Sequence, residues 1–279
     1  MSRWQRTVPL RSAARLFVQP TDRAQLCRAV ALCKAQGVRY YLLGNGSNIL
    51  FADEGYNGAV LDVSSMQDAV EVHGTQLTAG AGVRLSALCK TALEHGLTGL
   101  EFAYGIPGTV GGAVYMNAGA YGGEMKDVLT TVQYLTAEGE VKESAASELD
   151  LRYRHSIFEE NGGCILSAQF ALTPGEPEAI RAKMDELMAK RLDKQPLDKP
   201  SAGSTFKRPV GAFAAALIDQ CGLRGYRHGG AAVSEKHCGF VMNLGGATCA
   251  DVLALCEEVR TIVKEKTGYD LEKEIRVVR

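Results

Sequence analysis

The spacing of apolar residues along the chain predicts a series of helices. Leu26, Val30 and Cys33 recur at intervals that place side chains on one face of a helix. Asp22 precedes this face and Gly37 follows it, and these residue types commonly begin and end helices. The helices predicted in this way cover residues 21–36, 85–94, 177–193, 211–220 and 248–266.

Apolar runs and alternating patterns predict strands between these helices. Residues 70–79 are expected to form a hairpin that turns at His73-Gly74. Near the C-terminus apolar and charged residues alternate, which predicts a strand over 269–278. The other expected strands cover residues 38–43, 58–63, 128–136, 139–144, 163–172 and 239–243. Strands that alternate with helices in one part and form hairpins in another indicate an α+β fold.

Residues 104–123 follow neither pattern, and seven of them are glycine. A glycine inside a helix or strand costs roughly 0.5–1 kcal/mol relative to alanine, so we expect neither an ordinary helix nor an ordinary strand here. Such backbone either makes tight turns or comes very close to a ligand, and its N–H groups are suited to binding phosphate. From composition alone the two interpretations are evenly matched.

The composition narrows the classes of protein to which the chain can belong. The chain has 279 residues, 46% of them hydrophobic, and a net charge of −1, which indicates a globular protein of two or three domains. The near-neutral charge predicts no basic surface stripe, so we do not expect nucleic acid as a partner. There is no apolar run of roughly 18 residues, so no membrane span is expected. No secretory signal is visible, and we expect a cytoplasmic protein.

Cysteine and histidine residues give no metal-binding pattern. The eight cysteines form no C-x-x-C pair, and several lie beside leucine or alanine in expected helices. We therefore expect reduced, structural thiols. The five histidines show no H-x-x-x-H or H-E-x-x-H spacing, so a catalytic metal is not expected.

Two glycine-bearing loops, 44–48 and 104–123, are candidates for binding a phosphate-bearing ligand. Neither has the G-x-G-x-x-G pattern that opens a helix in the common dinucleotide fold, and neither has the G-x-x-x-x-G-K-[ST] pattern of nucleoside triphosphatases. Two such loops on an α+β scaffold suit a long ligand whose pyrophosphate is held at two places. The first loop taken alone is more typical of a turn.

Three further segments carry side chains that are suited to chemistry. Residues 152–154 place two arginines around a tyrosine, and a guanidinium binds both oxygens of a carboxylate, although an exposed strand edge is the simpler interpretation. Residues 201–209 form a glycine-centred turn with two serines, for which a capped loop before a helix is the simpler interpretation. Glu274 by itself is typical of a surface carboxylate paired with arginine, a contact worth about 0–1 kcal/mol.

Taken together, these motifs resemble one protein family. In order, they read Y-L-L-G-N-G-S-N-I-L, G-I-P-G-T-V-G-G-A-V-Y-M-N-A-G-A-Y-G, Y-R-H-S-I-F, S-A-G-S-T-F-K-R-P and L-E-K-E-I-R. This order resembles the UDP-N-acetylenolpyruvoylglucosamine reductase (MurB) family of peptidoglycan precursor synthesis, over nearly the whole chain. The short span between Arg154 and Gly163 is similar to the type II form of the family. The glycine motifs are shared more loosely with the vanillyl-alcohol-oxidase-type FAD-binding fold.

The resemblance implies UDP-N-acetylmuramate dehydrogenase activity, in which FAD and NADPH reduce the enolpyruvyl ether of UDP-N-acetylglucosamine to the lactyl ether. It assigns Arg154, Ser204 and Glu274 as catalytic residues. Hydride from the reduced flavin would go to the terminal enolpyruvyl carbon, and negative charge would develop on the adjoining carboxylate. Arg154 and Glu274 would stabilise this enolate, Glu274 as a protonated carboxyl or as an orienting group. Ser204 would protonate the carbon beside the carboxylate.

The resemblance also implies ligand-binding residues. Tyr153, Lys194 and Lys207 are the candidates for the diphosphate or sugar of a nucleotide-sugar substrate. The expected FAD contacts come from the two glycine loops, with the first loop on the pyrophosphate. They are Leu43, Gly44, Asn45, Gly46, Ser47, Asn48, Gly105, Ile106, Pro107, Gly108, Thr109, Gly111, Gly112, Ala113, Asn117, Gly119, Ala120, Tyr121 and Gly122.

The implied architecture is a two-subdomain FAD-binding fold followed by a smaller α+β substrate domain. We expect FAD-binding subdomains at 1–64 and 65–197, a substrate domain at 198–268, and a final strand at 269–279 that returns to the FAD-binding region. The clearest boundary is the stretch 194–200, which has two prolines and no periodicity. The chain departs from the family at its N-terminus, where the usual N-T-[TS]-[FW]-x-[IV]-G-G segment is missing. The first strand and the FAD affinity depend on that segment.

Two other functions stay open at this level. One is a different flavin oxidoreductase of the same cofactor fold, such as an oxidase of small alcohols, against which the serine-glycine loop and the terminal glutamate argue. The other is a non-catalytic nucleotide-sugar-binding relative, which the N-terminal difference favours. Flavin absorbance, and its recovery when the nucleotide sugar is added to reduced protein, would distinguish the three. The sequence does not indicate a protein partner.

Overall fold

The computed structural model describes residues 14–66 and 69–279. Its contacts divide the chain into two compact units, each described by itself below. The larger unit consists of Leu16–Asn45 and Gly58–Arg191. The smaller unit consists of Met1–Arg15, Gly46–Asn57 and Leu192–Arg279. The expected N-terminal departure from the family falls mostly on residues outside the described ranges.

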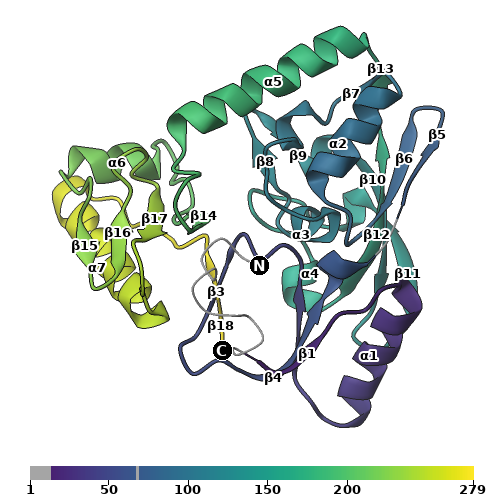
Figure 1. The fold of residues 1–279 in the computed structure, drawn as a ribbon, viewed down its shortest axis with the longest axis horizontal. Coiled ribbons are helices and arrows are strands. Elements are labelled where there is room, and N and C mark those ends of the chain that lie inside the picture. The colour runs from purple at the N-terminus through teal and green to yellow at the C-terminus, as the bar shows by residue number, and fades with distance from the viewer. Residues whose placement is uncertain (1–13, 67–68) are drawn as a thin grey trace. The chain divides into compact units, whose positions relative to one another are not determined.

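Seven α-helices and eighteen strands make up the described chain (Figure 1). The helices are α1 (Arg23–Ala35), α2 (Leu85–Glu94), α3 (Val110–Tyr115), α4 (Phe158–Asn161), α5 (Pro177–Lys194), α6 (Ala214–Gln220) and α7 (Cys249–Thr267). The strands are β1 (Ala14–Val18), β2 (Tyr40–Leu43), β3 (Ile49–Phe51), β4 (Tyr56–Asp62), β5 (Val70–His73), β6 (Gln76–Gly80), β7 (Leu97–Thr98), β8 (Gly119–Ala120), β9 (Gly123–Glu124), β10 (Leu129–Leu135), β11 (Val141–Ala145), β12 (Cys164–Ala171), β13 (Thr173–Pro174), β14 (Ser201–Ser204), β15 (Arg227–His228), β16 (Ala231–Val233), β17 (Phe240–Asn243) and β18 (Arg276–Val278). The five predicted helices, the hairpin over 70–79 and the α+β class are thereby confirmed.

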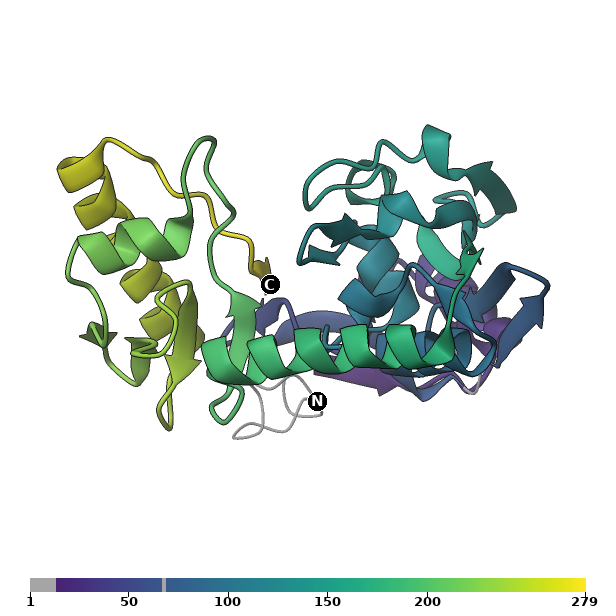
Figure 2. The same ribbon diagram turned by 90° about the horizontal axis from the view of Figure 1, so that it is seen from above.

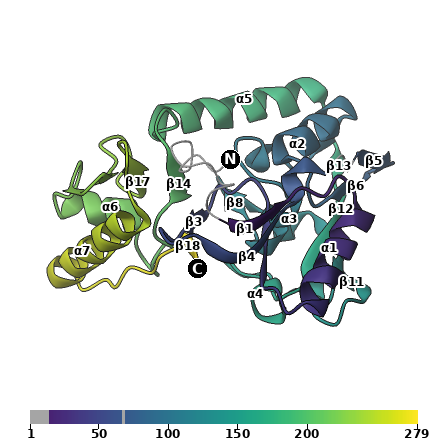
Figure 3. The ribbon, with the colours of Figure 1, turned by 60° about the horizontal axis from the view of Figure 1, so that its bottom comes forward.

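The larger unit is built on a five-stranded antiparallel sheet with the order β11-β10-β12-β6-β5. One apolar cluster packs α2 and α3 against this sheet, with Leu88, Val114 and Phe170 among its fully buried members. A second cluster joins α1, β4 and the sheet through Leu26 and Leu166. Figures 1 and 3 show α1 across the sheet from α2. The sheet is therefore covered on both faces.

The smaller unit combines a four-stranded antiparallel sheet, in the order β14-β17-β16-β15, with helices α6 and α7 (Figure 2). Its core contains Ile218 of α6 and Val259 of α7, both fully buried. Asp53, in the turn after β3, accepts hydrogen bonds from the first amides of α7, those of Cys249 (2.6 Å) and Ala250 (2.9 Å). This carboxylate fastens an early segment of the chain to the last helix.

The C-terminal segment differs from the continuous strand that was predicted over 269–278. Only β18 is a strand, and it pairs in parallel with β3. Before β18, the amides of Lys207 and Glu274 donate to the carbonyls of Glu272 and Thr205, each at 2.8 Å. The alternating pattern reflects burial, because Leu271 and Ile275 are both buried. It does not reflect a continuous ladder, because the main chain bonds to different segments in turn.

Two shorter segments also differ from the predictions. Residues 201–204 were expected in a loop but form β14, which pairs antiparallel with β17. The glycine-rich stretch was expected to contain no ordinary helix, yet α3 forms within it. A Cβ built on Gly111 would lie 2.8 Å from the Cβ of Ala81. Glycine is therefore needed for α3 to pack this closely, and tertiary contact outweighs its low helix propensity.

Candidate functional site

The two glycine loops meet in the larger unit. The side-chain amide of Asn45 donates a 2.7 Å hydrogen bond to the carbonyl of Pro107. A Cβ built on Gly44 would lie only 2.6 Å from Oγ1 of Thr109, so no other residue fits there without displacing that threonine. The sequence indicated two separate loops, and the structure brings the start of one against the middle of the other.

Thr109 anchors the glycine-rich stretch. It is 1% exposed, and its hydroxyl accepts a hydrogen bond from the amide of Gly112 at 3.4 Å, which caps α3. The amide of Gly111 donates to the carbonyl of Ala81 at 2.9 Å. Thr109, Gly111 and Gly112 therefore have structural contacts of their own, and their expected role toward FAD stays a prediction.

The end of the stretch has an unusual backbone. The backbone has positive φ at Asn117 (39°), Tyr121 (54°) and Gly122 (92°). Residues other than glycine seldom adopt this left-handed conformation. A Cβ at Gly122 would meet nothing within 4 Å, and Tyr121 is 47% exposed. The guanidinium carbon of Arg191 lies 5.9 Å from the centre of the Tyr121 ring. Open space beside glycine backbone, with an aromatic ring and a cation at its edge, fits a flat, negatively charged dinucleotide such as FAD.

Arg154 lies at a tight turn of the larger unit. The amide of His155 donates to the carbonyl of Arg152 at 3.1 Å, which closes the turn, and Arg154 occupies its third position with φ 54°. Its guanidinium donates to the carbonyl of Gly119 at 3.0 Å and lies 4.9 Å from the centre of the Tyr153 ring. The segment is therefore not an extended strand edge, and Arg154 is directed to the glycine-rich stretch. Tyr153 is 40% exposed.

Arg152 takes a different role from Arg154. Its guanidinium pairs with Asp150 at 2.7 Å, and the ring of His155 lies 3.1 Å from the same carboxylate. Arg152, and after it His155, holds the pKa of Asp150 below its usual value, so that carboxylate stays ionised. The two arginines that looked equivalent in the sequence therefore have separate partners.

Ser204 is the last residue of β14 and is exposed. Its neighbour Thr205 is buried and held by the carbonyl of Gly239 at 2.8 Å and by the amide of Val241, which donates to its hydroxyl at 3.0 Å. Gly203, which precedes Ser204, has a φ of 80°, a conformation that favours glycine. The sequence Gly-Ser-Thr thus places an exposed hydroxyl on a rigid base.

Glu274 lies beside the Ser204 segment in the smaller unit. Its amide donates to the carbonyl of Thr205 at 2.8 Å, and its carbonyl accepts from the side chain of Asn48 at 3.2 Å. The amide of Arg276 donates to the carbonyl of Asn48 at 3.0 Å. The structure therefore joins three predicted site segments, the end of the first glycine loop, the serine loop and the terminal glutamate, through main-chain contacts.

The two candidate substrate lysines have different surroundings. Lys207 pairs with Glu272 at 2.6 Å, a partner that the sequence did not indicate. Lys194 is the last residue of α5. Their expected contacts with the substrate stay predictions.

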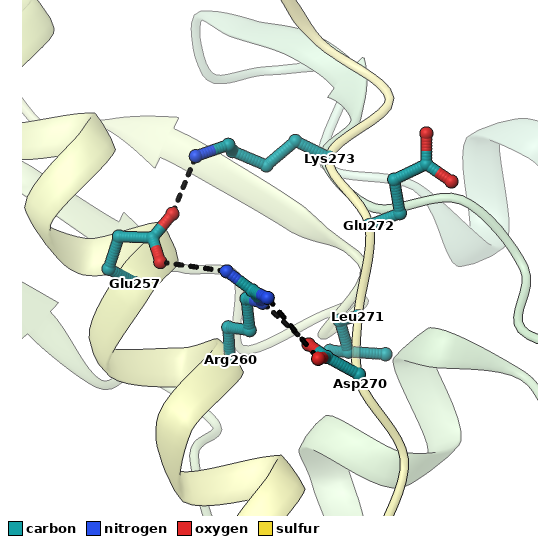
Figure 4. A pocket seen from close by; sticks show the side chains of 6 residues that line it. All are labelled: Glu257, Arg260, Asp270, Leu271, Glu272 and Lys273. Carbon is teal, nitrogen blue, oxygen red and sulfur yellow. Dashed lines mark hydrogen bonds and ion pairs between the residues drawn. The ribbon is translucent and has the colours of Figure 1, made fainter.

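A surface hollow of about 270 Å³ flanks the segment that leads to Glu274 (Figure 4). Glu257 binds Lys273 at 2.6 Å and Arg260 at 3.3 Å, and Arg260 binds Asp270 at 2.6 Å. Arg260 and Lys264 lower the pKa of Asp270, so the network stays charged at neutral pH. Figure 4 shows Glu272 directed away from these side chains. These ion pairs fasten the segment to α7, and the hollow contains none of the expected site residues.

Sequence reasoning missed Asp53 and the network around Arg260. Asp53 follows an apolar strand and lies 196 positions before its partner amide, so no local pattern signals the contact. Within the described ranges, no group of three or more His, Cys, Asp or Glu residues is placed to hold a metal ion. In the same ranges no helix has the length and apolar character needed to cross a membrane.

Comparison with known proteins agrees with this geometry. Residues 14–145 match the model of an FAD binding domain, and residues 195–278 match that of the C-terminal domain of UDP-N-acetylenolpyruvoylglucosamine reductase. The reductase of Agathobacter rectalis is 48% identical over 274 residues, covering 94% of this chain and 87% of that protein. The reductase of Caldanaerobacter subterraneus subsp. tengcongensis is 46% identical over 265 residues, with coverages of 95% and 87%.

A solved structure is similar over almost the same extent. The crystal structure of UDP-N-acetylenolpyruvylglucosamine reductase (MurB) from Thermus caldophilus is 36% identical, with a TM-score of 0.78, and the match covers 94% of this chain and 91% of that one. Sequence, domain order and fold thus agree along the chain. The chain belongs to the UDP-N-acetylenolpyruvoylglucosamine reductase (MurB) family.

Proposed function

We propose that this chain reduces the enolpyruvyl ether of UDP-N-acetylglucosamine to the lactyl ether with NADPH as the electron donor, and that Arg154, Ser204 and Glu274 carry the chemistry. Family membership makes the chain an FAD-dependent oxidoreductase of peptidoglycan precursor synthesis. The observation that carries the proposal is the 48% identity over 94% of the chain, which favours this reaction over oxidation of a small alcohol. The nucleotide-sugar substrate, the NADPH donor and the residue roles belong to the proposal.

The residues present fit FAD as cofactor. Asn45 and Gly44 lie against Pro107 and Thr109, so one ligand is able to touch both glycine loops. Bound against these two loops, FAD would supply hydride transfer, with electrons from NADPH, for reduction of the enolpyruvyl double bond. The glycine backbone of this chain binds and orients the cofactor, and the proposed role of Asn48 is to fix the end of the first loop through Glu274.

The charge that develops on the substrate carboxylate needs a positioned partner. The guanidinium of Arg154 is proposed to bind this carboxylate, because its planar fork matches two oxygens. Its contact with Gly119 and its place at a closed turn limit the positions available to it, which favours preorganisation. Glu274 is proposed to support the same charge as a protonated carboxyl, or to orient a group that does.

Ser204 is proposed to deliver a proton to the carbon beside the carboxylate. An aliphatic hydroxyl is a weak acid, so this step requires a water-poor site and a charge on the substrate that rises as the hydride arrives. The hydroxyl extends from the end of β14, and the next residue, Thr205, binds the amide of Glu274, so a substrate that covers both side chains would also exclude water from them. The serine recovers its proton from water after each turnover.

Two half-reactions measured on purified protein test the proposal. We expect visible flavin absorbance that NADPH removes under anaerobic conditions. Addition of UDP-N-acetylglucosamine enolpyruvate should then restore it at a rate fast enough for turnover. Fast recovery with oxygen but none with the nucleotide sugar would support an oxidase instead. Binding of the nucleotide sugar without any flavin absorbance would support the non-catalytic relative.

A further inference from the structure

We propose that Asn117 positions Arg154 for its contact with the substrate carboxylate. This inference rests on the proposed function, because it concerns how the catalytic arginine is held. Asn117 lies in the glycine-rich stretch and was expected to bind FAD. Its contacts lead instead to the turn that presents Arg154.

Asn117 is fully buried in the larger unit, with 0% of its surface exposed. A buried polar side chain without hydrogen-bond partners destabilises a fold, so the partners of Asn117 indicate its role. Its side-chain nitrogen donates to the carboxylate of Glu124 at 2.9 Å and to the carbonyl of Arg152 at 3.0 Å. Its side-chain oxygen accepts from the amide of Lys126 at 3.0 Å. Both amide hydrogens are therefore used within the protein.

The carbonyl of Arg152 is the acceptor that closes the turn of Arg154. It receives the amide of His155 at 3.1 Å and the side chain of Asn117 at 3.0 Å. One carbonyl therefore both closes the turn and ties it to the glycine-rich stretch. A shift of Asn117 would move the base of the turn and, with it, the residue at the third position.

Arg154 needs this support because its backbone is strained. The third position of this turn has a positive φ, which favours glycine or asparagine, so an arginine there is strained. Such strain persists only where surrounding contacts enforce it. Asn117 supplies one such contact, and its own left-handed φ of 39° suits asparagine better than most residues.

Two further contacts fasten the same two segments together. The hydroxyl of Ser156 donates to the carbonyl of Tyr115 at 2.6 Å, and the guanidinium of Arg154 donates to the carbonyl of Gly119 at 3.0 Å. Asn117 lies between these two contacts along the glycine-rich stretch. In the other two contacts the glycine-rich stretch contributes a main-chain carbonyl, whereas Asn117 contributes its side chain. A substitution at Asn117 therefore tests the connection between this stretch and the turn.

A double-mutant cycle between Asn117 and Arg154 tests the proposal. Asn117→Gly keeps the left-handed backbone and removes the tie. We expect it to slow flavin reoxidation by the enolpyruvyl substrate by on the order of 10–100-fold, and to change flavin reduction by NADPH less than about twofold. In an Arg154→Ala background the same substitution should cost less than about twofold, because the residue it positions is gone. Asn161→Gly, at the nearby end of α4, serves as a control and should leave reoxidation nearly unchanged.

Product affinity gives a readout that does not require turnover. Calorimetry with UDP-N-acetylmuramate should show weaker binding for Asn117→Gly and for Arg154→Ala, with no further loss in the double variant. Equal losses from Asn117→Gly in both backgrounds would overturn the proposal and leave Asn117 as a purely structural residue. If the wild-type protein neither binds this product nor is reoxidised by the substrate, the proposed function fails. That result is distinguishable from additive effects of the two substitutions, which would contradict only the role of Asn117.

A second variant covers the case in which Asn117→Gly does not fold. Asn117→Ser removes both amide donors without adding a charge beside the carboxylate of Glu124, and it enters the same cycle with the same expected result. Thermal unfolding and flavin content are measured for each variant. If neither variant retains flavin and a folded state, Asn117 serves the fold as a whole, and the proposal is wrong.

Discussion

At several positions in this protein, the space beside the backbone determines which residue fits. At Gly44 and Gly111 a Cβ would lie within 2.8 Å of a neighbouring atom. Ser204 and Glu274 show the converse, since their side chains extend from backbone whose hydrogen bonds go to neighbouring segments. Some positions are therefore needed for close packing, and others are fixed through their main chain, which leaves the role of the side chain to be tested.

Gly111→Ala should destabilise the protein. The added methyl group would overlap the Cβ of Ala81 at 2.8 Å and its carbonyl oxygen at 3.2 Å, and the neighbour is backbone that does not yield easily. We expect the free energy of unfolding in urea to fall by about 1–3 kcal/mol. Gly112→Ala, at an exposed position of the same helix where a Cβ would meet only Oγ1 of Thr109 at 3.5 Å, is the control for adding a methyl group without a clash. An unchanged unfolding midpoint for Gly111→Ala would contradict the close approach.

Ser204→Ala should separate the two half-reactions. Removing the proposed proton donor should leave flavin reduction by NADPH nearly unchanged and slow reoxidation by the enolpyruvyl substrate by on the order of 10²–10⁴-fold. Stopped-flow absorbance measures both rates. Ser201→Ala, at the buried start of the same strand, should not change their ratio. Equal slowing of both half-reactions by Ser204→Ala would mean that the serine is structural.

Glu274→Gln tests the second group proposed to support the enolate. The amide keeps the shape and the main-chain contacts to Thr205 and Asn48. Glutamine has no carboxyl proton to donate and cannot become ionised. We therefore expect reoxidation to slow by on the order of 10²-fold with flavin reduction retained. Glu272→Gln, which changes the exposed partner of Lys207, is the matched control. A retained reoxidation rate in Glu274→Gln would return this residue to the surface-carboxylate interpretation.

At the scale of elements, helix α7 organises the smaller unit. A capping box of Thr248 and Asp251 begins it, and the carboxylate of Asp53 binds its first two amides. Its exposed face binds the segment 270–273 through Arg260, Lys264 and Glu257. One helix therefore connects the turn after β3 with the chain that leads to Glu274.

Asp53→Ala should loosen the start of α7. Loss of the two hydrogen bonds that the first amides of the helix donate to this carboxylate should lower the free energy of unfolding by about 1–2 kcal/mol, measured in urea. Asp53→Asn should cost less, because an amide oxygen still accepts one of the two bonds. Glu54→Gln is the neighbouring control for loss of an exposed carboxylate. Equal effects at positions 53 and 54 would argue against the cap.

The Asp270 ion pairs should give a pH-dependent contribution to stability. Hydrogen bonds from Arg260 and then Lys264 lower the pKa of Asp270 in the folded state. The carboxylate therefore stabilises the fold at pH values above its unfolded pKa, and the contribution is lost as pH falls through the lowered folded pKa. Wild-type protein should exceed Asp270→Asn in urea midpoint at pH 7, and the difference should shrink below about pH 4.

Glu265→Gln is the control for this pH series. Glu265 is an exposed carboxylate on the same helix, so its replacement should not reproduce the trend. A difference between wild type and Asp270→Asn that stays the same from pH 7 to pH 3 would mean that the ion pairs are not its source. High salt should also reduce the difference, because exposed pairs are screened.

At the scale of the whole molecule, the cysteines lie mostly in the buried apolar clusters of the two units. All eight are free thiols, and seven are buried. Burial raises the pKa of Cys89, Cys164 and Cys256 to about 12, which keeps these thiols protonated. Buried, protonated thiols should react slowly, because the thiolate is the reactive form.

Thiol labelling checks this distribution. In folded protein we expect one fast-reacting thiol, Cys27, which is only partly buried, and slow reaction of the rest until denaturant is added. Cys27→Ser should remove the fast phase without changing the total that reacts after unfolding by more than one. Several fast-reacting thiols in native protein would show that one of the cores opens readily. A coloured disulfide reagent gives both the rate and the count.

The local elements were predictable because they depend on short-range patterns. The face of Leu26, Val30 and Cys33 forms α1, and all three side chains are buried. The Asp22 cap and the left-handed Gly37 follow from side-chain chemistry within a few residues. The family followed from the order of several motifs. These features are fixed by neighbours in the chain, so a sequence suffices to find them.

Contacts between distant segments were decided by the tertiary structure. Asp53 and Cys249 are 196 positions apart, and nothing near either one signals their hydrogen bond. The helix α3 forms against the local cost of glycine because Gly111 packs on Ala81. Asn117 reads in the sequence as part of a glycine-rich ligand loop, and only the fold shows its amide on the carbonyl of Arg152. The sequence alone determined the long helices, the hairpin over 70–79 and the family, because these depend on local patterns and motif order. The tertiary structure decided which side chains are used up within the protein and which extend from it, because that depends on partners brought together by folding.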